Sequence, residues 1–187
     1  MEKKMFVISE EADIRTKLSG SKITGKSFDS AERLFDYTRE LKVPGGVIAG
    51  YDHGEFGGKV SFISAAGREE ILVNENFKDF YILEDRLYAL TGMSNLFSDS
   101  GHLYELLMID DKWQAGEIMD LKSCPRSYLV ADKVLFIATD KELLIIENNE
   151  IIKAVEIEGP LFVGMDDGLV SVGYEDKTIT WYFLAAK

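Results

Sequence analysis

The chain has 187 residues, of which 46% are hydrophobic and 11% are aromatic. This composition excludes a disordered protein, because the chain has enough apolar surface to offset the entropy lost on folding. No segment approaches the roughly 20 consecutive apolar residues that a membrane helix needs, so we expect no membrane association. The single cysteine, Cys124, cannot form an internal disulfide, and it favours a cytoplasmic location.

The charge is strongly acidic. Lys and Arg number 21 against 33 Asp and Glu, which gives a formal net charge of −12. Such a field repels nucleic acids and anionic membranes unless the positive charges are gathered together, and here they are scattered along the sequence. We therefore expect no direct nucleic-acid binding. The negative charge fits a surface that keeps the protein in solution, and it also fits steering toward a basic partner.

Two elements are expected before residue 45. Residues 5–9 are a short apolar and β-branched run that predicts a strand. Residues 29–42 are predicted to form an amphipathic helix, because Asp29 can cap it, Glu32 follows three residues later, and apolar residues recur at helical spacing. Pro44 is expected to end this helix, and the helix is expected to pack on the body of the protein.

Everything after Pro44 is predicted to form short strands separated by turn residues, and short connections imply antiparallel neighbours. The polar pairs Asp110-Asp111 and Asn148-Asn149 and the triplet Asp166-Asp167-Gly168 are typical of tight hairpins. The predicted strands are 47–51, 59–64, 70–73, 79–83, 87–90, 102–109, 113–120, 128–130, 134–139, 142–147, 151–156, 161–164, 169–174 and 178–184.

Three segments repeat one pattern, in which an apolar strand leads through a turn containing aspartate into a second apolar strand. They are 80–90, 127–137 and 161–171, with Asp85, Asp132 and Asp166 in their turns. Residues 47–52 would open a fourth, more divergent copy. The copies begin about 34 to 47 residues apart, which is the length of a four-stranded unit. Residues 92–101 widen the first interval, and we interpret them as a flexible insertion and contact loop.

This pattern resembles the blades of a β-propeller. The resemblance implies a mainly β fold of antiparallel four-stranded meanders, forming a partial or small propeller-like array, with one N-terminal amphipathic helix. Two geometries remain open: either the last unit recruits residues 5–9 as its outer strand and closes a small ring, or the array stays open with covered edges. We expect residues 1–44 to pack as a strand and helix on a β-repeat domain spanning 45–187.

No catalytic or cofactor motif is recognisable, so we predict a protein that is not an enzyme and has no cofactor. The only histidines, His53 and His102, lack metal-binding spacing to each other or to Cys124, and no metal site is expected. Residues 52–55 and 98–102 contain reactive residue types but no catalytic signature. Residues 52–55 are interpreted as a turn between strands, and residues 98–102 as part of the flexible insertion and contact loop.

The leading functional hypothesis is a noncatalytic protein-binding module. Its acidic loops would bind a basic protein by charge complementarity. The candidate partner-binding residues are Glu69, Glu70, Asp99, Asp140, Glu175 and Asp176. In general character the chain is similar to bacterial immunity proteins, which implies an inhibitor that masks a cognate basic toxin, such as a nuclease.

Two other classes remain open at this stage. A small-molecule or sugar-binding enzyme of propeller type would place polar turn residues around a central pocket. A structural subunit of a larger assembly would expose a large apolar patch. Monomeric and dimeric states are both compatible with the sequence.

Overall fold

The fold is described by a computed structural model covering residues 7–8, 26–27, 37–131, 133–156, 162–166, 169–173 and 178–182. Within these ranges the chain is almost entirely β-strand, with one short 3-10 turn, η1, at Gly54–Phe56. Among the helices that the described residues form, none has the length and apolar character to cross a membrane.

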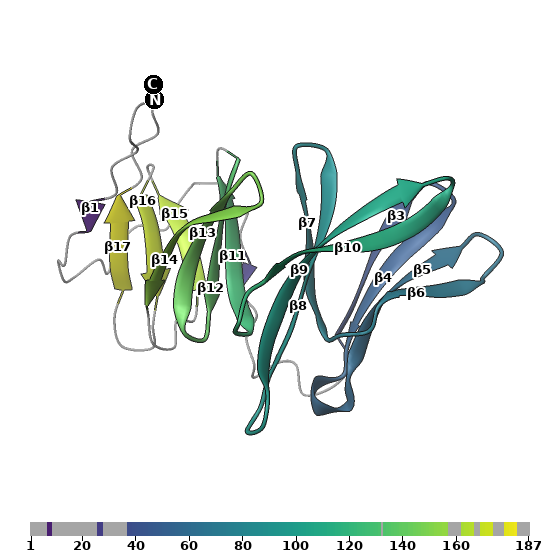
Figure 1. Ribbon diagram of the computed structural model, residues 1–187, viewed down its shortest axis with the longest axis horizontal. Helices are drawn as coiled ribbons and strands as arrows, with labels where there is room; N and C mark the ends of the chain where they lie inside the picture. The colour runs from purple at the N-terminus through teal and green to yellow at the C-terminus, as the bar shows by residue number, and fades with distance from the viewer. Residues whose placement is uncertain are drawn as a thin grey trace. The chain divides into compact units, whose positions relative to one another are not determined.

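Seventeen strands are found in the described part of the chain, and the strand pairings found there are antiparallel (Figure 1). Their bounds are β1 Val7–Ile8, β2 Lys26–Ser27, β3 Tyr37–Val43, β4 Gly46–Asp52, β5 Gly58–Ser64, β6 Glu69–Val73, β7 Phe77–Leu83, β8 Arg86–Ser94, β9 Asp99–Ile109, β10 Lys112–Asp120, β11 Pro125–Ala131, β12 Val134–Thr139, β13 Glu142–Glu147, β14 Glu150–Glu156, β15 Phe162–Asp166, β16 Leu169–Gly173 and β17 Thr178–Tyr182.

The strands form four sheets in two compact units. The central unit, Asp29–Pro125, contains the sheets β3-β4-β5-β6 and β7-β8-β9-β10. The terminal unit, Met1–Phe28 with Arg126–Lys187, contains β11-β12-β13-β14, extended by β2, and β15-β16-β17, extended by β1. In each sheet the strands that follow one another in the chain lie side by side, so the predicted antiparallel meander is confirmed.

Two of the predicted tight turns carry the expected backbone geometry. Asp110 and Asp111 have φ of 49° and 61°, and Asn148 and Asn149 have φ of 53° and 61°. Consecutive left-handed residues match the right-handed twist of the flanking strands, and Asp and Asn tolerate this region better than other side chains do. The triplet 166–168 lies partly outside the described residues.

The N-terminal strand completes the last sheet. Val7 pairs with Tyr182 and Ile8 with Trp181, so β1 lies along β17. The hypothesis that the final meander recruits a strand from residues 5–9 is therefore confirmed for these two residues. Closure of the four sheets into a ring stays a prediction.

The predicted helix over 29–42 is wrong where the structure describes it, because Tyr37–Val43 is strand β3, paired with β4 along its whole length. Residues 29–36 lie outside the described residues. Leu41 and Val43 pack against the core, and Arg39 forms an ion pair with the buried Asp79. These three residues alternate, as they do on one face of a strand.

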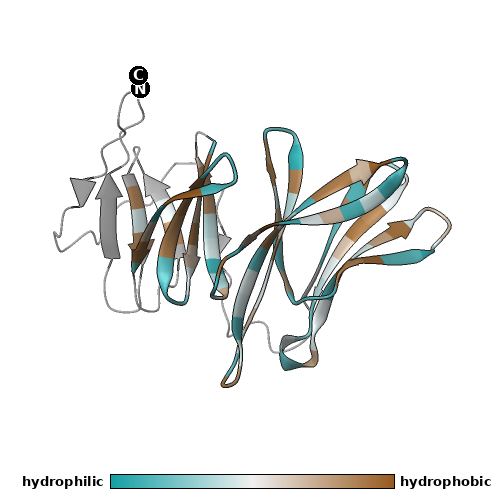
Figure 2. Cartoon of the chain, viewed as in Figure 1, coloured by the Kyte–Doolittle hydropathy of each residue, from teal (hydrophilic) through white to brown (hydrophobic). Residues whose placement is uncertain are grey.

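The core of the central unit lies between its two sheets. Phe77 of β7 is fully buried, and its ring centre lies 4.2 Å from that of Phe80. Gly50 of β4 leaves room for this ring, since a Cβ there would fall 2.3 Å from the Phe77 ring. Figure 2 shows apolar and polar residues interspersed along the strands of this unit. The buried cluster comprises Ile48, Val60, Val73, Phe77, Phe80, Ala89, Leu106 and Trp113.

The terminal unit has a core of the same kind. All six residues of β12 are buried, and three of them, Val134, Phe136 and Ala138, pack with apolar residues of β11, β13, β15 and β16. The buried Ser127 hydroxyl of β11 accepts a 2.8 Å hydrogen bond from the Val163 backbone N–H of β15. This bond ties the two sheets of the unit together.

Candidate functional site

The β8–β9 hairpin of the central unit projects toward the bottom of Figure 1. Residues 92–101, interpreted from the sequence as a flexible insertion, are mostly paired strand: Gly92 faces Gly101, and Ser94 faces Asp99. The two glycines are packing positions. A Cβ at Gly92 would lie 2.6 Å from Pro125 Cδ, and one at Gly101 would lie 2.3 Å from the Ser123 carbonyl oxygen.

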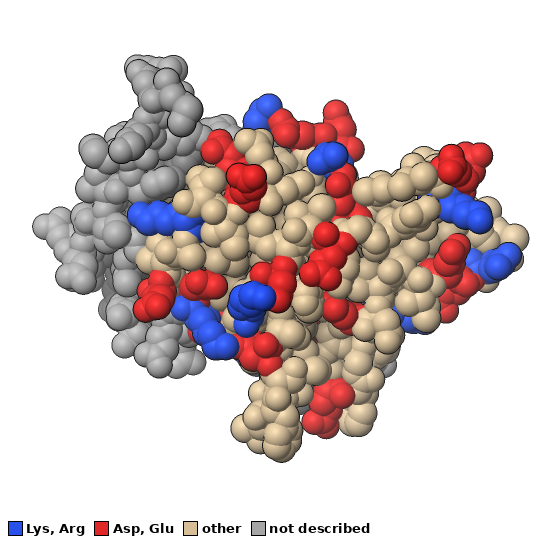
Figure 3. All heavy atoms as spheres, viewed as in Figure 1, with Lys and Arg blue, Asp and Glu red and all other residues tan. Residues whose placement is uncertain are grey.

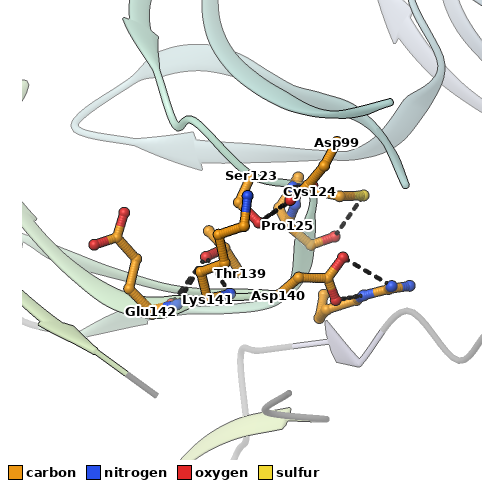
Figure 4. Close-up of polar contacts among 9 residues, drawn as sticks. Asp99, Ser123, Cys124, Pro125, Thr139, Asp140, Lys141 and Glu142 are labelled. Carbon is orange, nitrogen blue, oxygen red and sulfur yellow. Dashed lines mark hydrogen bonds and ion pairs between the residues drawn. The ribbon is translucent and has the colours of Figure 1, made fainter. Parts of the chain in front are cut away.

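Asp99, the first residue of β9 after the tip, holds the hairpin next to its tip. Its carboxylate accepts hydrogen bonds from the Ser123 hydroxyl at 3.0 Å and from the Cys124 backbone N–H at 2.8 Å (Figure 4). The Leu121 N–H donates to the Gly101 carbonyl at 2.8 Å. Ser123 and Cys124 are buried, so the segment after β10 fixes the strand that leads out of the tip.

The tip of the hairpin, residues 95–98, presents two large apolar side chains to solvent. Leu96 is 95% exposed and Phe97 is 96% exposed. The Asn95 side-chain oxygen accepts 2.8 Å hydrogen bonds from the Phe97 and Ser98 backbone N–H groups, and the Asn95 N–H donates to the Ser98 carbonyl. This turn orders the backbone beneath the exposed side chains. The tip is brown at the bottom of Figure 2 and uncharged in Figure 3.

A cavity of about 450 Å³ lies beside the same hairpin. Its wall combines the η1 turn, the connection from β6 to β7 and the two strands of the hairpin. The lining includes His53, Phe56, Glu75, Asn76, Met93 and Ser100. Phe56 is itself 87% exposed. It is a large exposed apolar side chain in the cavity lining, in addition to Leu96 and Phe97 at the hairpin tip.

Three side chains contact the carboxylate of Glu75, which lines the cavity. Its Oε2 accepts a 2.6 Å hydrogen bond from the Thr91 hydroxyl and lies 2.9 Å from His102 Nδ1. Its Oε1 accepts a 3.0 Å hydrogen bond from the Tyr104 hydroxyl. Burial, together with the neighbouring Glu75, raises the pKa of Tyr104 well above its ordinary value, which keeps this hydroxyl protonated as a donor.

The η1 turn is fixed by a second set of polar contacts. Asp52 Oδ1 accepts a 2.9 Å hydrogen bond from the Gly54 N–H, and its Oδ2 lies 2.8 Å from the Lys78 ammonium. The Asn76 amide donates to the Gly54 carbonyl at 2.5 Å. Residues 52–55, interpreted from the sequence as a turn, therefore hold one wall of the cavity in place.

The predicted partner-binding acids occupy different settings. Glu69 and Glu70 begin β6 and are exposed. Asp99 starts β9, where its carboxylate holds the hairpin as described above. Asp140 follows β12 and forms a bidentate ion pair with the Arg126 guanidinium, in which Nη2 lies 2.9 Å from Oδ2 (Figure 4). Glu175 and Asp176 lie outside the described residues.

The ion pair between Lys59 and Glu69 can be tested through the pKa of Glu69. The Lys59 ammonium, 2.7 Å away, lowers the pKa of Glu69 below its ordinary value. A depressed pKa in the folded state means that the pair stabilises the fold above pH 4.5 and that this contribution is lost as the pH falls through the folded value. NMR titration should show the Glu69 pKa rising toward its ordinary value in Lys59→Met. An unchanged pKa in that variant would contradict the pairing.

Cys124, His53 and His102 make contacts with different residues. Cys124 is buried, with its Sγ 3.8 Å from the Pro125 carbonyl oxygen. His53 stacks on Tyr51 at the η1 turn, whereas His102 contacts Glu75. Among the residues that the structure describes, no group of three or more His, Cys, Asp or Glu has a metal-binding arrangement.

Sequence reasoning missed Leu96, Phe97 and Phe56 as surface features. A signal for the first two was present, because an apolar pair stands between Asn95 and Ser98 in a turn where polar residues are the rule. The Glu75 cluster had no local signal, since its donors come from strands 16 to 29 residues away in the sequence. Comparison of the chain with known protein families and with characterised proteins gives no match.

Proposed function

We propose that the chain is a noncatalytic protein-binding module, and that it binds a basic partner protein through the β8–β9 hairpin tip. In its most specific form, the proposal is an inhibitor of immunity-protein character, acting in the cytoplasm, that masks the active cleft of a cationic toxin. The observation that carries the proposal is the pair Leu96 and Phe97, both almost fully exposed at the end of an ordered hairpin.

Exposing two large apolar side chains side by side favours contact with another protein. Aromatic anchors near the centre of an interface often contribute most of its binding energy. The Asn95 turn and the Asp99 contacts order the hairpin before binding, so less conformational entropy is lost when the partner docks. The hairpin therefore has the features of a preformed anchor.

Charge supplies the second part of the proposal. The chain carries a net charge of −12, and Figure 3 shows acidic side chains distributed over the described surface with fewer basic ones among them. A field of this sign accelerates encounter with a basic protein and weakens at high salt. Exposed acids such as Glu69 and Glu70 would serve this long-range attraction, while the hairpin tip makes the close contact.

The experiment is quantitative capture from an extract of the native organism, with the tagged full chain compared with a Leu96→Ser/Phe97→Ser variant. The wild type is expected to retain a basic protein that is released by raised salt. The double variant is expected to bind it at least 30-fold more weakly, because two anchors of about 1 kcal/mol or more each are removed.

Ile82→Ser is the matched control, because Ile82 is an exposed isoleucine of β7 in the same unit and lies outside the hairpin. Its capture should equal that of the wild type, and all three proteins should show the same melting temperature. Capture that survives in the double variant, or that Ile82→Ser loses to the same extent, would refute the proposed role of the hairpin.

A further inference from the structure

The cavity beside the hairpin has features that point to a charged ligand group. Met93 and Ser100, which line it, lie opposite each other on β8 and β9 of the hairpin that carries Leu96 and Phe97. On the other side the cavity is bounded by the η1 turn with the exposed Phe56. A partner that contacts the tip would therefore reach the cavity along the same strands.

The Glu75 carboxylate has an acceptor position left over. A carboxylate offers about four lone-pair positions, two on each oxygen. Within the described part of the chain, Oε2 has two partners, Thr91 and His102, and Oε1 has one, Tyr104. One position on Oε1 therefore has no partner among the described residues, and it belongs to a cavity-lining carboxylate whose orientation is set by three contacts.

A second polar group at the wall also lacks a partner. Asn76 lines the cavity, is only 4% exposed, and its side-chain oxygen accepts no hydrogen bond in the described structure. Its amide nitrogen is occupied by the Gly54 carbonyl, so the oxygen is the unused end. A buried acceptor without a donor is unfavourable, and a ligand donor would relieve this cost.

We propose that this cavity binds the ammonium or guanidinium group of a lysine or arginine side chain supplied by the protein partner. The inference rests on the proposed function, because it assigns the cavity to the same partner that the hairpin contacts.

A cation suits this wall better than a neutral donor does. Thr91 and Tyr104 contact Glu75 as neutral donors, and His102 carries a positive charge only when it is protonated. With a neutral His102, these three contacts orient the carboxylate and leave its negative charge in place. Hydrogen bonds between two ionised groups are roughly twice as strong as those between neutral groups. Lys59, which also lines the cavity, has its ammonium 2.7 Å from Glu69. The exposed Phe56 ring can pack on the aliphatic stem of the incoming side chain.

The test uses a small probe and needs no partner. Nα-acetyl-arginine methylamide is titrated into the full chain and followed through the backbone amide signals of Glu75, Asn76, Met93 and Ser100. The expected result is a saturable shift of these signals, with at least tenfold weaker binding of the citrulline analogue, which has the same shape and no charge. Glu75→Gln should weaken binding of the arginine probe at least tenfold.

Two further variants keep the test decisive. Asp111→Asn removes the same charge from an exposed position in the β9–β10 turn, outside the cavity lining, and should bind like the wild type. Met93→Trp adds bulk to the wall without removing a contact of Glu75, so it should block the probe even if Glu75→Gln fails to fold. Equal binding of the arginine and citrulline probes, no saturable shift, or full binding by a folded Glu75→Gln would overturn the inference.

A negative result in the titration and a negative result in the capture experiment have different consequences for the two proposals. If the hairpin variants lose the partner and the probe does not bind, the proposed function stands and the cavity inference falls. If no partner is captured and the probe still binds through Glu75, the cavity's preference for a cation is supported and the assignment of that cation to a protein partner is overturned.

Discussion

Replacing Phe77 by alanine is expected to lower the free energy of unfolding by about 4 kcal/mol, within the range for truncating buried aromatic residues. Phe77 is fully buried between the two sheets of the central unit, with Phe80 beside it and Gly50 directly beneath its ring. Truncation leaves a cavity at the contact between β4 and β7. Urea unfolding followed by Trp113 fluorescence, in a Trp181→Phe background, measures the change within this unit.

The close approach of Gly50 to the Phe77 ring can be tested with a double variant. Gly50→Ala alone places a Cβ 2.3 Å from the Phe77 ring and should cost about 1–3 kcal/mol through overpacking. In the Gly50→Ala/Phe77→Ala double variant the clash is absent, so the combined loss should be smaller than the sum of the single losses by at least about 1 kcal/mol. Additive losses would show that the two residues do not contact each other.

Replacing Arg39 by methionine is expected to cost about 3 kcal/mol, at the lower end of the range for breaking a buried ion pair. Asp79 is fully buried, whereas the Arg39 side chain is 31% exposed, so water partly screens the pair. The Arg39 guanidinium also donates to the Phe80 carbonyl at 3.2 Å. The variant removes the Arg39 cation from a buried carboxylate, and the loss of an ion-pair partner makes a buried charge less favourable.

The double variant Arg39→Met/Asp79→Asn separates charge from packing. If the loss of stability in Arg39→Met arises from the negative charge of Asp79, a neutral amide at position 79 should restore more than half of the lost free energy of unfolding. Chemical denaturation of the two variants and the wild type provides the comparison. A neutral effect of Arg39→Met, or no recovery in the double variant, would contradict the assignment of residues 37–43 to a strand that carries this pair inward.

Most of the sheet structure was predictable because its signals are local. Strands β12 and β13 were predicted with the bounds that the structure shows, since each is a continuous apolar run limited by polar turn residues. The turns at Asp110-Asp111 and Asn148-Asn149 were predictable for the same reason. A two-residue connection with left-handed geometry needs side chains that tolerate it, and both pairs show positive φ.

Strand β3 was mispredicted because its alternation depends on a distant residue. Arg39 lies on the same face as Leu41 and Val43, but a charged residue at that position breaks the apolar pattern in the sequence. Its partner Asp79 follows 40 residues later and cannot be found from local spacing. The turn at Pro44 and Gly45, where Gly45 has φ of 84°, was consequently interpreted as the end of a helix.

The candidate site was largely hidden for a similar reason. Residues 92–101 were interpreted as a flexible insertion because they widen the first repeat interval, whereas Gly92 and Gly101 allow close packing against Pro125 and Ser123. The Glu75 network depends on the register that places Thr91 opposite His102 in the hairpin. Acidic residues were predicted as partner contacts from charge alone, which could not show that Asp99 and Asp140 also hold internal contacts.

The most direct test of the proposed binding face is photo-crosslinking from within it. The full chain is prepared with benzoyl-phenylalanine at position 97 or, as the control, at position 82, and each protein is irradiated in an extract of the native organism. The proposal predicts a covalent adduct with one basic protein from position 97 and none from position 82. Adducts from position 82 but not from position 97 would contradict it, because the partner would then contact a face other than the hairpin tip.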